Sequence, residues 1–125
     1  MDMTDVTAGG PLWAVVSNYY RNIDRQDIDA ALSCFVRDTV YRRPGYDAFI
    51  GYTAISQFYH EDRVIASGRH DLEAVIEDGD MVAVRGSFHG TSRSGDPITV
   101  RFADFWRFSG LQLVERDTYF DLAAV

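Results

Sequence analysis

The 125-residue chain contains no lysine, and all twelve of its basic residues are arginine. The 19 Asp and Glu residues outnumber these arginines and give a net charge of −7. An acidic chain without a run of basic residues argues against a nucleic-acid partner or an anionic membrane surface. The sequence also lacks an apolar run near the roughly 18 residues of a membrane-spanning helix, and we expect no signal peptide. We therefore expect a cytoplasmic protein.

Cysteine is almost absent too, because Cys34 is the single cysteine of the chain. One cysteine excludes an internal disulfide, and no group of residues has the spacing of a metal-ligand set. We therefore expect neither a metal nor another cofactor. Aromatic residues, by contrast, are plentiful, with 2 Trp, 7 Tyr and 8 Phe. Length and composition predict one domain over residues 11–125 with a single core, preceded by a flexible segment at 1–10.

Three helices are expected in the first half of the chain. Apolar residues recur at helical spacing over about 11–24, and Asp27 is typical of the residue that caps a short second helix. Thr53 is the expected cap of a third helix, which ends near Gly68. The residues expected to face the core from these helices are Trp13, Val16, Tyr19, Tyr20, Ile23, Ile28, Ala31, Leu32, Phe35, Ile55, Phe58, Tyr59, Asp62 and Ile65.

The second half of the chain alternates with a period of two residues, as strands do. A hairpin turn is indicated by the Glu-Asp-Gly-Asp run at 77–80. Helices followed by a meander of strands predict an α+β fold, in which three N-terminal helices pack on a strongly bent, mainly antiparallel sheet. The expected strands cover about 38–41, 70–77, 81–89, 100–108 and 111–122.

The strand at 100–108 carries an acid within an apolar row. Alternation places Asp104 on the same face as Phe102 and Trp106, where a core is expected. An isolated buried carboxylate is very costly, so Asp104 must be paired, hydrogen-bonded or held neutral. It is either a functional group of a pocket or a buried carboxyl that Tyr or Arg partners satisfy without a chemical role.

A set of local motifs follows the order and spacing of a known superfamily over about residues 11–122. The motifs are Tyr19-Tyr20, Asp27-Ile28-Asp29-Ala30, Phe35-Val36-Arg37-Asp38, Gly51-Tyr52-Thr53-Ala54-Ile55, Phe58-Tyr59, Phe102–Phe108 and Tyr119-Phe120-Asp121. Together they resemble the nuclear transport factor 2-like superfamily, which includes ketosteroid isomerases, SnoaL-like polyketide cyclases and limonene epoxide hydrolases. The resemblance implies a cone-like α+β barrel with an apolar pocket between sheet and helices, and a homodimer. It does not by itself imply an activity.

Within that superfamily, the ketosteroid isomerases use a helical tyrosine and a protonated strand aspartic acid, which both donate hydrogen bonds to an enolate oxygen. By resemblance, Tyr19 and Asp104 fall at the matching positions. The general base of those enzymes is an aspartate directly before a proline, whereas this chain has Arg43 before Pro44. Steroid-type isomerisation by that mechanism therefore lacks its base.

His70 is the best replacement for the missing base, because its ordinary pKa range suits proton transfer near neutral pH. A lone histidine beside Leu72 and Ala74 can equally be a hydrogen-bonded core residue. SnoaL-like cyclases, which this chain resembles in size, need mainly a strand aspartate in an apolar pocket with a histidine nearby. Asp104 and His70 meet that pattern.

Five further residues are candidates for substrate binding. Arg43 is either a surface guanidinium or a clamp at the pocket mouth for an anionic or carbonyl substrate. Tyr41, Tyr59, Trp106 and Tyr119 are either pocket walls or ordinary core aromatics.

The catalytic triad of limonene epoxide hydrolases is incomplete in this sequence. Arg85 offers the arginine, but Ser87 stands where the first aspartate is expected. Thr118 replaces the second aspartate, and Asp117 is offset by one residue, which turns its side chain to the other face of a sheet. Epoxide hydrolysis by that triad is disfavoured.

The sequence therefore predicts a small cofactor-independent isomerase or cyclase that acts by acid/base chemistry on an apolar carbonyl or polyketide-like molecule. Asp104 and His70 would move protons, and Tyr19 would bind the substrate oxygen. One alternative is a non-catalytic module that binds a small molecule in the same pocket. Another is a structural dimer whose interior is filled by Trp106, Tyr59 and Tyr119.

Overall fold

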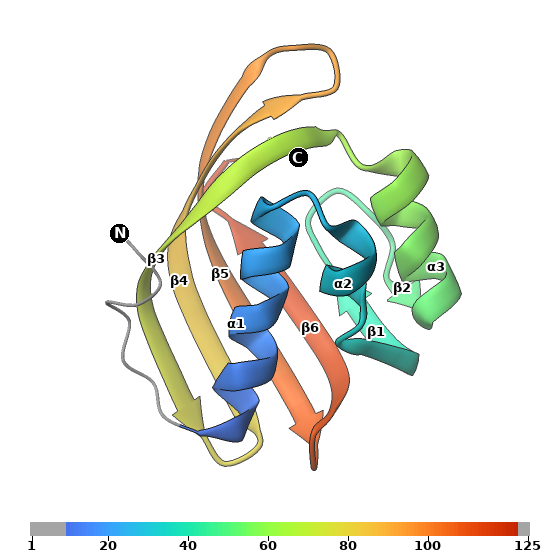
Figure 1. Cartoon of the computed structure of the whole chain (residues 1–125), viewed down its shortest axis with the longest axis vertical. Helices are drawn as coiled ribbons and strands as arrows, with labels where there is room; N and C mark the ends of the chain where they lie inside the picture. The colour runs from blue at the N-terminus through green and yellow to red at the C-terminus, as the bar shows by residue number, and fades with distance from the viewer. Residues whose placement is uncertain (1–9, 123–125) are drawn as a thin grey trace.

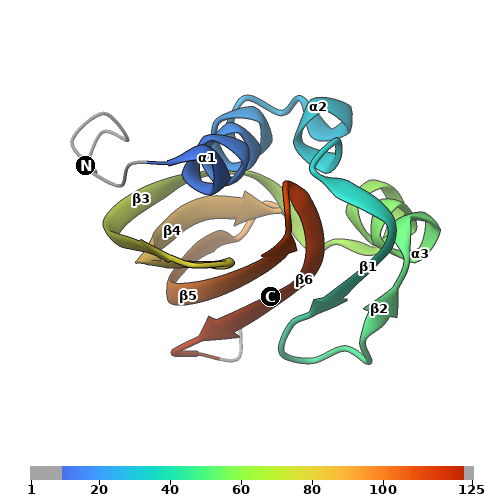
Figure 2. The same cartoon turned by 90° about the horizontal axis from the view of Figure 1, so that it is seen from below.

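The computed structural model describes residues 10–122, so the flexible segment expected at 1–10 lies, apart from Gly10, outside the described residues. The helices lie against one side of a curved six-stranded sheet, which confirms the expected α+β class (Figure 1, Figure 2). No helix in this part of the chain is long and apolar enough to cross a membrane. In chain order the elements are α1 (Pro11–Asp24), α2 (Ile28–Leu32), β1 (Phe35–Arg42), β2 (Phe49–Ile50), α3 (Tyr52–Gln57), the π-helix η2 (Phe58–Asp62), β3 (Ile65–Asp78), β4 (Met81–Ser92), β5 (Pro97–Ser109) and β6 (Gln112–Phe120).

Helix α1 covers the predicted range because an apolar row with helical spacing runs along one side of it. Pro11 lies in the first turn, where the N–H that proline lacks has no partner within the helix. The side chains of Tyr19, Tyr20 and Ile23 are all buried. Two adjacent tyrosines of one helix therefore both reach the interior.

Helix α2 begins as predicted after Asp27, whose carboxylate accepts a hydrogen bond from the backbone N–H of Ala30 at 3.2 Å. It ends at Leu32, earlier than expected, because strand β1 begins at Phe35. Phe35 therefore joins the core from a strand and not from a helix.

The third helical segment differs most from the prediction. It begins after Gly51 without a side-chain cap from Thr53, and its last turn is the wider π-helix η2. The backbone N–H of Arg63 closes η2 by a 2.8 Å bond to the carbonyl of Phe58, and the backbone of Arg63 itself is extended. Ile65 therefore starts strand β3 and does not continue the helix.

The strands lie in the order β2-β1-β6-β5-β4-β3, and all neighbours are antiparallel except β1 and β6. The two-residue strand β2 was not predicted, because a segment that short carries no periodicity. Register shifts interrupt the β3–β4, β5–β6 and β1–β6 ladders. Such bulges bend strands, and Figure 2 shows the sheet curving below α1.

Two paired glycines of β3 and β4 make room for an aromatic ring on the concave face. Gly68 pairs with Gly90, and a Cβ atom at Gly68 would lie 2.2 Å from Cζ of Phe88. The Phe88 ring in turn packs against the His70 ring at a centroid distance of 4.8 Å. These glycines therefore help to fix the position of His70.

Candidate functional site

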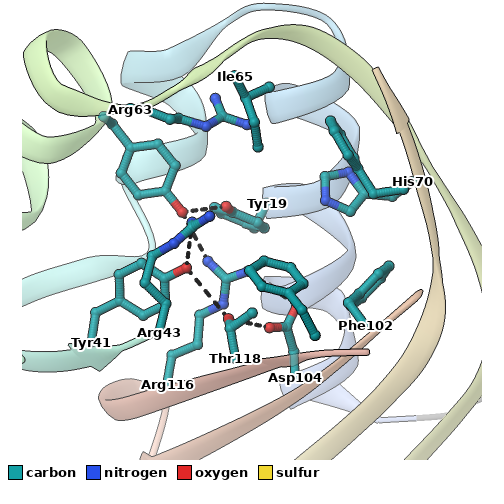
Figure 3. A pocket seen from close by; sticks show the side chains of 13 residues that line it. Tyr19, Tyr41, Arg43, Arg63, Ile65, His70, Phe102, Asp104, Arg116 and Thr118 are labelled. Atoms are coloured by element: carbon teal, nitrogen blue, oxygen red, sulfur yellow. Dashed lines mark hydrogen bonds and ion pairs between the residues drawn. The ribbon is translucent and has the colours of Figure 1, made fainter. Parts of the chain in front are cut away.

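A small cavity lies between α1 and the concave face of the sheet (Figure 3). The centre of a water molecule can reach about 30 Å³ of it, which is room for about two waters. Helix α1, the π-helix η2 and every strand except β2 contribute to its wall. The lining residues are Tyr19, Tyr41, Arg43, Tyr59, Arg63, Ile65, His70, Phe88, Phe102, Asp104, Arg116, Thr118 and Phe120.

Asp104 lies at the base of this cavity with 1% of its surface exposed. Its Oδ2 accepts hydrogen bonds from the Tyr20 hydroxyl at 2.5 Å and from Nη2 of Arg116 at 3.0 Å. Its Oδ1 accepts from the hydroxyl of Thr118, which is its cross-strand neighbour on β6. All three partners donate, so Asp104 acts as an ion-paired carboxylate and not as a neutral hydrogen-bond donor.

Arg116 is the buried counter-ion of Asp104 and was not predicted as a site residue. Its guanidinium carbon lies 4.4 Å from the ring centroid of Trp106 and 4.5 Å from that of Tyr19. Nη1 donates to the Tyr59 hydroxyl at 2.9 Å. Burial alone would lower the pKa of Arg116, but Asp104 and the surrounding tyrosines raise it well above its ordinary value. The Arg116 guanidinium therefore stays charged and forms a buried ion pair with Asp104.

Tyr19 and Tyr59 join their hydroxyls across the cavity at 2.5 Å. Burial raises the pKa of both phenols, so both remain neutral and able to donate. Because the Tyr59 oxygen already accepts from Arg116, its proton can point to the Tyr19 oxygen. The proton of Tyr19 is then available to a ligand, at the end of a chain that begins at Arg116.

Tyr41 differs from these tyrosines in its electrostatic surroundings. Burial raises its pKa, but the charges of Arg116 and Arg43 outweigh that effect and lower the pKa below its ordinary value. Nη1 of Arg43 donates to the Tyr41 hydroxyl at 2.9 Å. Arg43, 7% exposed, therefore belongs to the buried cavity wall and not to the protein surface.

His70 faces the cavity from β3 and is held by the last residue of α1 (Figure 3). Its Nδ1 lies 2.6 Å from Oδ1 of Asp24, and its backbone N–H donates to Oδ2 of the same carboxylate at 2.9 Å. The hydrogen-bond pattern assigns the proton to Nδ1, which leaves Nε2 as an acceptor. The rings of Tyr20 and Phe102 hold the imidazole at centroid distances of 5.1 and 5.3 Å.

Arg63 lies on the cavity wall with 7% of its surface exposed. Its guanidinium carbon lies 5.3 Å from the centroid of the Tyr59 ring. Its Nε is buried without a hydrogen-bond partner among the described residues, and no carboxylate in that part of the chain pairs with it. Sequence reasoning missed Arg63 because it was placed inside a helix.

Three expectations about the pocket need correction. The phenol that meets Asp104 belongs to Tyr20, while Tyr19 points to Tyr59. Trp106 is fully buried but is not part of the cavity wall; its indole N–H donates to the Tyr20 hydroxyl at 3.3 Å. Tyr119 is 57% exposed and packs on Phe105, because it follows inward-facing Thr118 and so lies on the outer face of the sheet.

The other two predicted wall residues, Tyr41 and Tyr59, do line the cavity. Among the residues described, no cluster of three or more His, Cys, Asp or Glu side chains could hold a metal ion. What the cavity offers is therefore a basic imidazole nitrogen, a phenol donor and several guanidinium groups.

The fold is that of the nuclear transport factor 2-like proteins, as comparison with solved structures shows. A protein of this fold and of unknown function from Burkholderia pseudomallei K96243 superposes with a TM-score of 0.81 at 23% identity, over 90% of this chain and 92% of the other. A candidate polyketide cyclase from Pseudomonas putida KT2440 gives a TM-score of 0.81 at 17% identity, over 91% and 94%. TerC, co-crystallised with polyporic acid, gives 0.78 at 25% identity, over 90% and 92%.

Within this class, residues 16–116 match the SnoaL-like domain, and the chain belongs to that family. The resemblance inferred from the sequence motifs is thereby confirmed. The sequence has no match among curated proteins.

Proposed function

We propose that this protein is a small cofactor-independent isomerase or cyclase that transfers protons on a carbonyl compound. The observation that carries the proposal is the His70–Asp24 pair, which leaves Nε2 of His70 free on the wall of a cavity that also contains Tyr19. A histidine oriented by a carboxylate through Nδ1 is a common arrangement for a general base. The similarity to a candidate polyketide cyclase supports the same class of reaction.

In the proposed reaction, Nε2 of His70 removes a proton from the carbon next to the carbonyl group. The electron pair of that C–H bond forms a C=C bond, and the carbonyl oxygen becomes an enolate. The Tyr19 hydroxyl donates a hydrogen bond to this oxygen, supported by Tyr59 and Arg116 behind it. A donor of this kind contributes roughly 3–4 kcal/mol to transition-state stabilisation when well placed.

The enolate then has two outcomes. If protonated His70 returns the proton to a different carbon, the product is an isomer of the substrate. If the enolate carbon attacks a second carbonyl carbon, a C–C bond closes the ring, and the new alkoxide takes the proton back from protonated His70. Asp104 is a positioning residue in this scheme, because donors already occupy both of its oxygens.

The volume of the cavity restricts the substrate. About 30 Å³ accommodates the reacting end of a molecule but not a compound of several fused rings. Of the two substrate types expected from the sequence, an apolar carbonyl compound and a polyketide-like molecule, we therefore favour the one with a small carbonyl end. Phe120 and His70, which are partly exposed, mark the side from which that end would enter.

Proton exchange into D₂O tests the proposal, because any carbonyl compound that the base acts on exchanges its α-proton even when no product accumulates. A panel of small ketones and oxo acids is incubated with the protein, and loss of the α-proton signal is followed by NMR. His70→Gln should slow enzyme-dependent exchange by about 10²- to 10⁴-fold, the usual contribution of a general base.

His60→Gln is the matched control, because His60 also contacts a carboxylate, Asp29 at 3.0 Å, but lies on the exposed surface. This variant should exchange at the wild-type rate. Undiminished exchange in His70→Gln contradicts the proposed base. Saturable binding without exchange of any compound would instead support the alternative, a binding module of the same fold.

A homodimer and a cytoplasmic location stay predictions of this proposal. The outer face of the sheet carries Phe105 and Tyr119, which are 40% and 57% exposed and would be covered in a dimer. Sedimentation equilibrium, repeated with Phe105→Ser, measures whether this face associates.

A further inference from the structure

The cavity is electropositive although the protein as a whole is acidic. Three guanidiniums, those of Arg43, Arg63 and Arg116, line it, each 7% exposed or less. Among the described lining residues Asp104 is the one carboxylate, and it is paired with Arg116. The chain as a whole carries a net charge of −7, so positive charge is concentrated where a ligand would bind.

Arg63 is the least compensated of these three guanidiniums, because Arg43 and Arg116 each donate to a phenol while the Arg63 side chain has no hydrogen-bond acceptor among the described residues. Transfer of a guanidinium from water to the protein interior is costly unless an anion and hydrogen-bond acceptors compensate for it. The Tyr59 ring below Arg63 supplies a cation–π contact but accepts no hydrogen bond from it. In the described residues the Arg63 side chain has no carboxylate partner, and its Nε has no acceptor.

The position of Arg63 is fixed by the backbone and not by a partner for its charge. Its N–H closes the π-helix η2, and its neighbour Ile65 begins strand β3. Figure 3 shows the Arg63 side chain extending along the cavity toward Ile65, on the same side as His70. A ligand bound beneath it would therefore also lie within the region that His70 and Tyr19 border.

We propose that this cavity binds a carboxylate and that the substrate is a small oxo acid whose carboxylate is held by Arg63. The planar fork of a guanidinium matches the two oxygens of a carboxylate, and Arg43 adds a second positive charge nearby. The small volume favours a short anion over a bulkier one such as a nucleotide phosphate chain. This inference rests on the proposed function, because the oxo group would be the carbonyl that His70 and Tyr19 activate.

Pyruvate and its neutral amide, pyruvamide, are the probes for this site. They have nearly the same shape, and only pyruvate carries a carboxylate. Binding is measured by NMR chemical-shift titration of the protein at low ionic strength. Wild-type protein should bind pyruvate at least about tenfold more tightly than pyruvamide, a difference of about 1.4 kcal/mol.

Arg63→Gln should remove this preference, and Arg63→Lys should retain part of it, since lysine keeps the charge but not the fork. Arg85→Gln is the control, because Arg85 is an exposed arginine with 62% side-chain exposure that lies 3.8 Å from Glu73. Equal binding of the two probes by wild-type protein, absence of binding, or an unchanged preference in Arg63→Gln overturns the inference.

His70→Gln separates this inference from the proposed function. It should still prefer pyruvate over pyruvamide, because Arg63 is intact, while it loses proton exchange. Pyruvate binding that is lost in Arg63→Gln supports the carboxylate site even if no exchange is found in wild-type protein. If proton exchange proceeds equally well on neutral ketones and on oxo acids, this result contradicts the carboxylate site but leaves the proposed function intact.

Discussion

The two sides of the cavity differ in how completely their polar groups are paired. On one side, Asp104 accepts hydrogen bonds from Tyr20, Thr118 and Arg116. On the other side, no described residue accepts a hydrogen bond from the Arg63 side chain or bonds to Nε2 of His70. Within the described part of the chain, Nε has no hydrogen-bond partner in Arg43, Arg63 or Arg116, so the contrast lies in the other guanidinium nitrogens, which do donate in Arg43 and Arg116. Paired groups stabilise the fold and fix geometry, whereas unpaired groups are available to a ligand. In the proposed function, the acid that the sequence makes conspicuous is therefore a positioning residue, and proton transfer takes place at the opposite wall.

The largest expected effect comes from breaking the paired side. Arg116→Met leaves the Asp104 carboxylate buried without its counter-ion, which should lower the free energy of unfolding by about 3–5 kcal/mol. Urea denaturation measures this loss. The double variant Arg116→Met/Asp104→Asn should recover a large part of it, because no unpaired charge remains. Arg63→Gln removes a charge from the other side and should lower the free energy of unfolding far less. An equal loss in the two variants would contradict the proposed difference between the two sides.

The adjacent tyrosines of α1 give a second, matched comparison. Tyr20→Phe removes a donor to a charged carboxylate and should destabilise the protein by about 1.5–3 kcal/mol. Tyr19→Phe removes a bond between two neutral phenols and should cost about 0.5–1.5 kcal/mol. Thermal unfolding of the two variants measures the difference. Activity should follow the reverse order, with Tyr19→Phe slowing proton exchange more strongly than Tyr20→Phe.

Asp24→Asn tests the unpaired side without touching the cavity wall. The asparagine should hold the imidazole less well and no longer stabilise its charged form, so proton exchange should slow at least about tenfold. Binding of pyruvate should stay at the wild-type level, since Asp24 is not part of the cavity wall and Arg63 is unchanged. A loss of binding equal to the loss of exchange would show that Asp24 acts on the shape of the cavity and not on His70.

The smallest effect is expected from alkaline pH. Burial raises the pKa of Tyr20 and Tyr59 well above the ordinary value, so the unfolded chain releases these protons first, near pH 10. The folded state then holds more protons, and the stability that these two phenols contribute declines as pH rises above 10. Tyr41, whose pKa is lowered, contributes in the opposite direction.

The absence of lysine makes this titration easy to interpret, since no ammonium side chain ionises near pH 10. The single thiol, Cys34, adds to the decline equally in wild-type protein and in Tyr20→Phe, because burial raises its pKa to about 12. Denaturation curves between pH 9 and 11 should show a shallower decline for Tyr20→Phe than for wild-type protein. An identical decline would mean that burial and the neighbouring Asp104 do not raise the pKa of Tyr20 in the folded protein.

Strong periodicity made much of the fold predictable from sequence. The apolar row of α1 and the alternation around Asp104 are local patterns, and both predicted the burial that is observed. Ile65 was misplaced because a π-turn followed by an extended Arg63 has no local signature that distinguishes it from a continuing helix. The register of β6 was equally hidden, since Arg116 stands between Glu115 and Asp117 in what reads as an exposed charged run.

The site was less predictable, because its key partners are far apart in sequence. A bulge opposite Phe108 shifts the β5–β6 register, and Arg116 then reaches the interior beside Asp104. Asp24 ends a helix, where a carboxylate usually faces solvent, and nothing local links it to His70. An apolar repeat with a period of two or 3.6 residues indicates which face of a strand or helix is buried. It does not indicate which buried groups contact one another across the core.

The bond from Tyr20 to Asp104 spans 84 residues, and strand β1 finds its parallel neighbour only in β6. On a ribosome, the first helix therefore emerges long before the strands that complete its burial. Contacts of such long range fold slowly, because the loop between them must close before any contact forms. A nascent chain that stops short of β6 holds Asp104 without Arg116, and the cavity exists only when the last strand has been made.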